Sequence, residues 1–304
     1  MSTPVERPYL LHMITTAKNL SPFDVNMAYD AGWNACTPYV DVSLDDIQGL
    51  VQDAIFSRGP KGVRRTGIFL GGRDAHLAID MLEAARKAMV PPFEVSVCAD
   101  PSGAFTTAGA MVACVESALQ KTHGTGLSGQ RTLVFGGTGP VGSAAAVLAA
   151  RAGADTLIVS HQGLTAAQQS AAYCSERYGV TLAAADGSSD ERCSELMREA
   201  DVVFNAAKAG IQVLGSHHIA AAGRLKVACD VNAVPPKGIE GVELMDNAEP
   251  IRASRSGAVG IGALAVGNVK YKAQNHLLTQ MREAETPQYL GFDAAFEAAR
   301  EYAG

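Results

Sequence analysis

The sequence predicts an α/β protein with two domains: a Rossmann-type doubly wound nucleotide domain and a smaller parallel α/β substrate domain. The first observation is the length of 304 residues, which suits about two domains, with 47% of the residues hydrophobic. The second is that short apolar runs of strand character alternate with helical runs along the chain. The third is a glycine-rich turn that follows one of these strands and opens a helix.

We expect the substrate domain over residues 1–125, the nucleotide domain over residues 126–255, and a C-terminal helical segment over residues 256–304. The last segment is expected to pack back on the first domain, because a Rossmann domain does not need it. In the first domain we expect strands over residues 9–14, 37–42, 66–70 and 93–99, helices starting at Ser21, at Ser43 and after residue 74, a loop at residues 57–60, and a helix over residues 108–120.

The second domain repeats the alternation with short loops. After its last strand, residues 237–256 read as loop and turns. The expected elements are strands over residues 132–135, 156–160, 181–184, 201–205 and 226–229, and helices starting near Pro140, Thr165, Asp190 and Ser216.

The glycine-rich turn is the strongest functional signal in the sequence. We expect Gly137 to allow the tight turn off the strand, Gly139 to let the backbone approach a pyrophosphate, and Gly142 to let the helix pack close to the strand. The helix N-terminus then offers free N–H groups and a partial positive charge to the phosphates. The residues of this turn assigned to the cofactor are Gly137, Thr138, Gly139, Pro140, Val141 and Gly142.

The end of the next strand bears on the choice between NAD and NADP. An NAD site usually has an acid there, whereas this chain has Ser160 and His161. NADP is therefore permitted, yet no Arg or Lys is present to grip a 2′-phosphate, so we expect NADP as cofactor with NAD possible; a plain loop histidine is the alternative for His161. Further cofactor contacts are expected after the later strands, at Ala206, Ala207, Lys208 and Asn232, of which Lys208 is alternatively a solvent lysine.

Composition excludes several other classes of protein. The net charge is −6 and basic residues are scattered, which gives no reason to expect nucleic acid or a membrane as partner. The six cysteines show no CxxC pair and read as free thiols in a reducing cytoplasm, so we expect no metal site. Adjacent His217 and His218 are expected to be surface residues, since neighbours on a helix point in different directions.

Five runs of residues together resemble one family: residues 21–25, 100–107, 136–142, 230–236 and 260–270. They are similar to the bacterial NAD(P)-dependent methylenetetrahydromethanopterin dehydrogenases of methylotrophs, and the resemblance extends over nearly the whole chain. It implies a two-domain enzyme with a C1-pterin cleft between the domains, and a cytoplasmic homo-oligomer, a trimer or hexamer. A branch of the family uses tetrahydrofolate, so the resemblance fixes the reaction better than the pterin carrier.

The implied reaction moves a hydride from a methylene bridge between two nitrogens to the nicotinamide, and leaves a methenyl cation. No proton leaves with the hydride, so no general base is required and alignment dominates. We assign Asp24 and Lys270 as the catalytic residues, with a helix-dipole carboxylate as the alternative for Asp24. The substrate-binding assignments are Arg58, Asp100, Ser102, Thr106, Thr107 and Lys272; the alternatives are a surface arginine, a helix cap at residues 100–107 and a solvated Lys272.

Two other functions stay open from the sequence. One is a different dehydrogenase of the same two-domain plan, such as a shikimate-type enzyme. The other is a nucleotide-binding sensor without turnover, because intact glycines indicate only binding. Assay with both nicotinamide cofactors and both methylene pterins would separate these functions.

Overall fold

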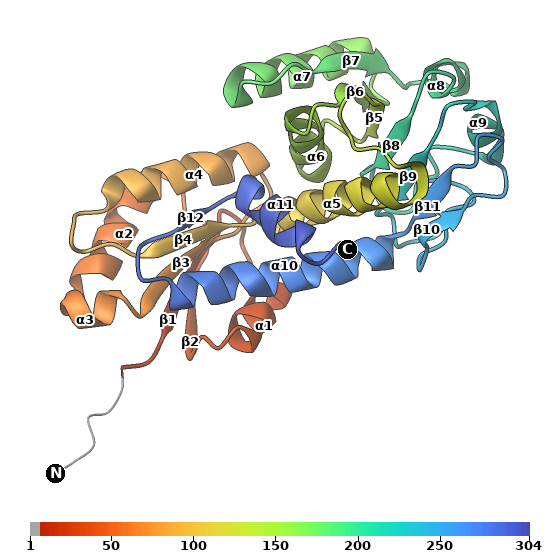
Figure 1. Ribbon diagram of the computed structural model, residues 1–304. Coiled ribbons are helices and arrows are strands. Elements are labelled where there is room, and N and C mark those ends of the chain that lie inside the picture. Colours follow the sequence, from red (N-terminus) through yellow and green to blue (C-terminus); the bar gives the residue numbers. More distant parts are fainter. Residues whose placement is uncertain (1–6) are drawn as a thin grey trace. The chain divides into compact units, whose positions relative to one another are not determined.

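The structure, a computed structural model, describes residues 7–304 and divides into two compact units (Figure 1). The first unit comprises the described residues through Thr106 together with Tyr271–Ala298, and the second comprises Thr107–Lys270 and Ala299–Gly304. Three helices contribute residues to both units: α5 (Ala104–His123), α10 (Ala263–Glu283) and α11 (Phe292–Arg300), the last with only its final two residues in the second unit.

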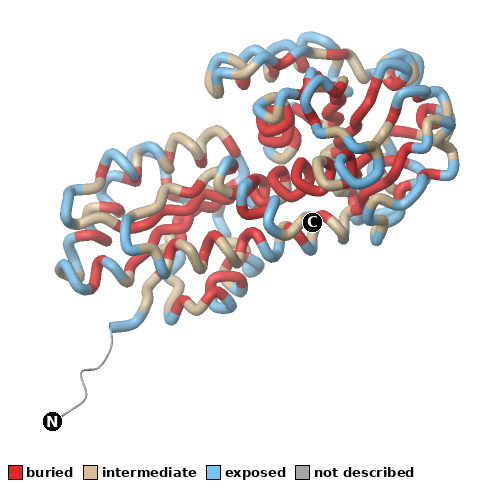
Figure 2. Tube along the Cα trace, in the orientation of Figure 1, coloured by how far each residue is buried: buried red, intermediate tan, exposed pale blue. Residues whose placement is uncertain are grey.

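The first unit is built on a five-stranded sheet in the order β12-β4-β3-β1-β2, in which every pair of neighbours is parallel. All five residues of β3 are buried, as expected for a parallel strand covered on both faces (Figure 2). Trp33 Nε1 donates to the backbone carbonyl oxygen of Leu278 on α10 at 3.1 Å, which anchors the helix in this unit. The strands are β1 (Leu10–Ile14), β2 (Ala35–Tyr39), β3 (Thr66–Leu70), β4 (Ser96–Ala99) and β12 (Tyr289–Leu290), and the other helices are α1 (Pro22–Asp30), η1 (Leu44–Asp46), α2 (Ile47–Phe56), α3 (Gly59–Val63), α4 (Ala75–Ala88), η2 (Pro101–Gly103) and α11 (Phe292–Arg300).

The second unit is built on a seven-stranded sheet in the order β10-β11-β9-β8-β5-β6-β7. Its neighbours are parallel except for β10, which runs antiparallel to β11 at one edge. The strands are β5 (Arg131–Phe135), β6 (Asp155–Ser160), β7 (Ala183–Asp186), β8 (Val202–Asn205), β9 (Val227–Asp230), β10 (Asn247–Pro250) and β11 (Val259–Ile261), and the helices are α6 (Pro140–Arg151), α7 (Leu164–Tyr178), α8 (Asp190–Met197) and α9 (Ser216–Ala221).

Each sheet has one point where the strand order reverses. In the first sheet the reversal lies at β1, which pairs with β2 on one side and β3 on the other. In the second sheet it lies at β5, between β6 and β8. Open parallel sheets bind ligands in the crevice outside the carboxyl ends of strands at such a point. Ligand sites are therefore expected at the loops after β1, β3 and β5.

The predicted fold class and most of the predicted elements are confirmed. The predicted strand at residues 66–70 matches β3, and the helices predicted from Pro140 and Asp190 begin at those residues. The loop predicted at residues 57–60 is wrong in part, because the short helix α3 begins at Gly59.

The largest error lies after residue 236. Residues 237–256 contain β10, and the segment predicted to be helical begins with β11, which pairs in parallel with β9. The C-terminal residues therefore complete the second sheet as well as contributing to the first. These strands are only three and four residues long, too short to show periodicity in the sequence.

Candidate active site

A pocket of about 230 Å³ opens at the reversal point of the first sheet. Thr15 and Asn19 in the loop after β1, Gly71 and Gly72 after β3, and Asp24 in α1 are among the residues that line it. The position is the one that the strand order predicts. Thr15 and the glycine pair were not among the predicted site residues, although two glycines directly after a buried strand were a usable signal.

Asp24 is the third residue of α1 and lies in its first turn, after Pro22 and Phe23. Its side chain is only 3% exposed, and its Oδ1 accepts a hydrogen bond from Gln274 Nε2 at 2.8 Å. A carboxylate that serves only the helix dipole would be solvated at the surface. A buried carboxylate lining a pocket fits the substrate-side role assigned to Asp24.

Ser102 lines the same pocket and is exposed. Its backbone is left-handed, with φ +51°, and its Oγ donates to the carbonyl oxygen of Gly72 at 2.7 Å. Gly72 itself has φ +125°. Non-glycine residues in this region persist where the surroundings fix them, and they gather at ligand sites. The bond ties the loop after β3 to the loop after β4 and shapes one wall of the pocket.

The other polar residues after β4 form a helix cap. Asp100 is buried, and its carboxylate accepts from the backbone N–H of Phe105 at 2.9 Å and of Thr106 at 3.2 Å, and from Thr106 Oγ1 at 2.6 Å. These bonds satisfy donors at the start of α5, as an N-terminal carboxylate does. Asp100 and Thr106 therefore take the alternative role of cap, while Thr107 is half-buried in the first turn of the same helix.

Arg58 lies at the opposite edge of the sheet from the pocket. Its guanidinium donates to the carbonyl oxygens of Arg65 and Pro8 at 2.9 and 3.0 Å, and to Thr66 Oγ1 at 3.1 Å, all at the amino ends of β1 and β3. Burial and the nearby Arg7 and Arg65 lower the pKa of Arg58. The substrate contact expected for Arg58 is corrected to a structural role. The guanidinium is hydrogen-bonded at the amino ends of the strands, whereas the pocket lies at their carboxyl ends.

The two lysines assigned on α10 differ in their setting. Residues two apart on a helix point about 200° apart, so Lys270 and Lys272 face opposite sides of α10. Lys270 is half-buried, whereas Lys272 is exposed, as expected for the solvated lysine that was its alternative. Lys270 instead shares a helix face with Gln274, four residues later.

In the second unit the glycine turn follows β5 at the reversal point and leads into α6. The left-handed residue of the turn is Gly136, with φ +71°, and a Cβ there would lie 2.5 Å from the backbone of Ala206 and Ala207. Gly137, the next residue of the same turn, is also restricted to glycine, because a Cβ there would lie 2.8 Å from the Val134 carbonyl oxygen. The turn predicted at Gly137 therefore begins one residue earlier, at Gly136. A Cβ on Gly142 would lie 2.8 Å from the Cα of Gly137, which confirms the close helix packing predicted for Gly142.

Gly139 differs from these two glycines. It precedes α6 in an extended conformation, with φ −90°, that any residue adopts. Apart from its chain neighbours, a Cβ there would meet only one described atom within 4 Å, the Gly136 carbonyl oxygen at 3.4 Å. The fold itself therefore does not require glycine at position 139, whereas a ligand that approaches the backbone closely would require it. Thr138 and Pro140 are exposed and Val141 is half-buried at this N-terminus, and the first turn of α6, fully within the described residues, has no acidic side chain.

A buried polar network shapes the loops after β8 and β9. Asp230 accepts from Asn205 Nδ2 at 2.8 Å and from the backbone N–H of Asn232 and Ile239 at 3.0 and 2.9 Å. Asn232 Oδ1 accepts from the N–H of Gly210 at 3.1 Å and of Val234 at 3.0 Å, and its Nδ2 donates to the Pro236 carbonyl at 2.8 Å.

Asn232 therefore holds the loops after β8 and β9 together, and it lies at the carboxyl edge of the second sheet. Ala206 and Ala207 beside it are half-buried and Lys208 is exposed. Asn205 was missed in the sequence, because a polar residue closing an apolar strand gives no pattern of its own.

The end of β6 is as expected in having no acid, but an acid lies beside it. Ser160 is buried, and its Oγ accepts from the N–H of Gln162 at 3.1 Å, while His161 is exposed. Asp186 ends β7 directly opposite Ser160 in the parallel register. Hydrogen bonds from Ser188 lower the pKa of Asp186, so this carboxylate is ionised at neutral pH.

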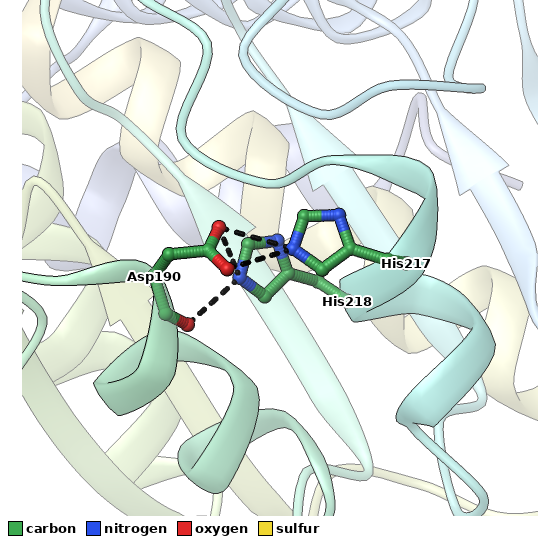
Figure 3. Close-up of side chains that lie close together, drawn as sticks. All are labelled: Asp190, His217 and His218. Carbon is green, nitrogen blue, oxygen red and sulfur yellow. Dashed lines mark hydrogen bonds and ion pairs between the residues drawn. The ribbon is translucent and has the colours of Figure 1, made fainter.

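His217 and His218 form a cluster with Asp190 that links α9 to α8 (Figure 3). The expectation that both are surface residues is wrong for His218, which is only 2% exposed. His218 Nδ1 accepts from the N–H of Gly215 at 3.0 Å, so Nε2 carries the proton and lies 3.2 Å from the Asp190 carbonyl oxygen. A metal bound at Nε2 would need the proton on Nδ1, where a donor already points. The cluster is therefore arranged as a hydrogen-bonded tie between helices.

The remaining composition-based expectations concern thiols and the membrane. All six cysteines are free, as predicted. Burial raises the pKa of Cys98 and Cys229 well above the ordinary value of a thiol. Among residues 7–304, the structure contains no helix whose length and hydropathy would allow it to span a membrane.

Solved structures share the fold of the chain. NAD-dependent malic enzyme from Thermotoga maritima matches with a TM-score of 0.58 and 13% identity, covering 96% of this chain and 84% of that chain. Shikimate 5-dehydrogenase from Listeria monocytogenes, solved in complex with shikimate and NAD, matches with a TM-score of 0.52 and 15% identity over 98% of both chains. At these identities the likeness concerns the fold alone.

The sequence comparisons identify the family. The family model described as methylene-tetrahydromethanopterin dehydrogenase, N-terminal, matches residues 22–102. The NAD(P)-dependent methylenetetrahydromethanopterin dehydrogenase of Methylorubrum extorquens is 46% identical over 97% of this chain and 99% of its own length. The bifunctional protein MdtA of the same organism is 32% identical over 90% of this chain and 92% of its own length. The chain therefore belongs to the family of NAD(P)-dependent methylenetetrahydromethanopterin dehydrogenases.

Proposed function

We propose that the protein transfers a hydride between the methylene group of methylenetetrahydromethanopterin and NAD(P), giving methenyltetrahydromethanopterin. The observation that carries the proposal is the near full-length identity of 46% with a dehydrogenase of that name. The buried carboxylate of Asp24 in a pocket at one reversal point and the glycine turn at the other support it.

In this proposal the second unit binds the dinucleotide. The N–H groups at the start of α6 and the unobstructed backbone of Gly139 would hold its pyrophosphate. Ala206 and Ala207 leave room beside the turn for the nicotinamide ribose, and Ser160 and His161 would lie near the adenosine ribose. When bound, NAD(P) supplies the hydride acceptor. NADP remains the expected cofactor, with NAD possible.

The first unit binds the pterin in this proposal. Asp24 would accept hydrogen bonds from the N–H and amino edge of the pterin ring, and its charge would stabilise the positive charge that develops on the substrate. Because that charge is delocalised over the two substrate nitrogens, no side chain has to remove a proton. Ser102 and Thr107 remain candidate contacts to the pterin, and Lys270 a candidate partner for its carbonyl group.

Three finer points belong to the same proposal. We infer a cytoplasmic enzyme, from its free thiols, and a homo-oligomer, either a trimer or a hexamer, from the family resemblance. Methylenetetrahydrofolate stays the alternative substrate, and we infer no nucleic-acid partner, since the net charge is −6.

The test is a rate assay on the purified protein. Reduction of NADP or NAD is followed by absorbance with methylenetetrahydromethanopterin and, separately, with methylenetetrahydrofolate. We expect turnover with the first pterin. Turnover with the folate alone would replace the substrate, and cofactor binding without turnover on either pterin would favour a nucleotide sensor.

A further inference from the structure

Gln274 is a buried polar residue of α10 with buried apolar residues on both sides of it in the sequence. Its side chain is 1% exposed, and its neighbours Ala273, Leu277 and Leu278 are buried as well. Its Nε2 donates to Asp24 Oδ1 at 2.8 Å, across 250 positions of the chain. Both residues belong to the first unit.

The setting of Gln274 calls for a reason beyond packing. A buried amide left without hydrogen bonds costs about 1–3 kcal/mol, whereas a leucine or methionine would fill the same space without that risk. The hydrogen bond to Asp24 supplies a reason. An amide N–H can only donate, so it favours Asp24 as an acceptor.

The geometry distinguishes the roles of the two side chains. Asp24 lines the pocket, while Gln274 is not among the lining residues and reaches the carboxylate from α10. By holding Oδ1, Gln274 restricts the rotation of the carboxyl group about its last bond. The orientation of Asp24 toward the pocket therefore depends on α10, which Trp33 anchors through the Leu278 carbonyl at 3.1 Å.

We propose that Gln274 is a positioning residue that holds the Asp24 carboxylate in the orientation in which it accepts from the pterin ring. This inference rests on the proposed function of the Asp24 pocket. It adds a residue outside the pocket to the determinants of the reaction, and it makes the face of α10 that carries Gln274 part of the substrate-side machinery.

Two variants separate positioning from packing. Gln274→Met keeps the side-chain length and removes the donor, so we expect kcat/KM for the methylene pterin to fall about 5- to 100-fold, mainly in kcat. The KM for NADP should stay within about twofold of the wild-type value. Gln280→Met, at a half-buried position on the same helix, is the matched control and should leave both parameters unchanged.

Gln274→Glu provides a pH signature that a packing defect would not produce. Two carboxyl groups in hydrogen-bond contact cannot both be ionised cheaply, so the introduced acid donates to Asp24 only when it is protonated. We expect its activity to rise at least about fivefold from pH 8 to pH 6, relative to wild type. Charged or titratable groups near Asp24 include Arg73 in the pocket lining and Cys98 at the end of β4, with Asp100 close to Cys98, and Lys270 precedes Gln274 by one turn of α10; all are the same in each variant.

The wild-type assay is run first, so that the two proposals fail separately. A wild-type protein inert toward both pterins refutes the proposed function and this role with it. An active wild type with an unimpaired Gln274→Met variant refutes the positioning role alone. Equal losses in Gln274→Met and Gln280→Met, or a flat ratio of Gln274→Glu to wild-type activity across pH, would also overturn it. Urea denaturation of each variant checks that the protein assayed is folded.

Discussion

Gly139 is the N-cap of α6 and Gly142 lies three residues later in the first turn of that helix, yet the structure predicts opposite failures when each is replaced by alanine. A Cβ on Gly142 would lie 2.7 Å from the Gly136 carbonyl carbon and 2.8 Å from the Gly137 Cα, and neither backbone atom can move freely. A Cβ on Gly139 would meet only the Gly136 carbonyl oxygen, at 3.4 Å. A side chain at position 142 is therefore excluded by the protein backbone, whereas a side chain at position 139 would be excluded by a bound ligand.

The magnitudes follow from these distances. Overpacking against backbone should lower the free energy of unfolding of Gly142→Ala by about 1–3 kcal/mol. For Gly139→Ala we expect a change within about 1 kcal/mol, because the backbone conformation suits alanine. A methyl group at Gly139 would push a pyrophosphate off the helix N-terminus and weaken one or two charge-assisted hydrogen bonds, at about 2–4 kcal/mol, or roughly a 30- to 700-fold higher Kd.

The assay combines urea denaturation with a fluorescence titration of NADPH on the same samples. Gly139→Ala should unfold near the wild-type midpoint and bind NADPH poorly, whereas Gly142→Ala should unfold early. Wild-type affinity in a folded Gly139→Ala protein would refute the placement of the pyrophosphate at this turn. A wild-type midpoint for Gly142→Ala would refute the packing argument.

The remaining predictions concern four other side chains. Asp24→Ala should lower kcat by about 10- to 200-fold, because it removes the electrostatic stabilisation that one negative charge gives to a cation developing about 5 Å away. The affinity for NADPH should be unchanged in the same titration. A large loss of cofactor binding would contradict the assignment. Asp186→Asn should lower the KM for NADP about two- to fivefold and leave that for NAD unchanged, because a 2′-phosphate bound near Ser160 would lie within about one Debye length of the ionised carboxylate of Asp186, which pairs with Ser160 in the sheet; equal changes for both cofactors would argue against it. His218→Phe should cost about 1–3 kcal/mol in urea denaturation, and a chelator should not move the wild-type midpoint; a shift with chelator would indicate a bound metal. Half-buried Cys36, whose pKa is raised by burial, should react with a thiol reagent faster than the five buried cysteines and speed up as pH rises, and labelling of another cysteine first, identified by mass spectrometry, would contradict the burial pattern.

The sequence was most informative where one strand and one helix determine the outcome. The turn after β5 was predictable because glycine spacing and an apolar strand act locally, although the left-handed residue of the turn is Gly136, one residue before the first glycine that was assigned a role. The position of Asp24 was predictable because a carboxylate in a first helical turn after a strand is a local pattern, and its role in the reaction stays a prediction.

The features that were missed depend on contacts between distant segments. Gln274 is one of several polar residues on a long helix, and only its distance of 2.8 Å from Asp24 distinguishes it. Asp186 lies beside Ser160 because β6 and β7 pair in register, which the sequence does not state. Arg58 was misassigned because its acceptors at residues 8, 65 and 66 come together only when β1 and β3 lie side by side.

The outermost strands of both sheets have a consequence for assembly. β10 runs antiparallel, its register shifts between Asn247 and Glu249, and it ends at Pro250. β2 carries Pro38, β12 has two residues, and β7 has four. Interruptions, prolines and short lengths are the devices by which edge strands resist recruiting a strand from another molecule. Copies of this protein that associate should therefore do so through helices and loops, and the subunits should remain separable without breaking a continuous intermolecular sheet.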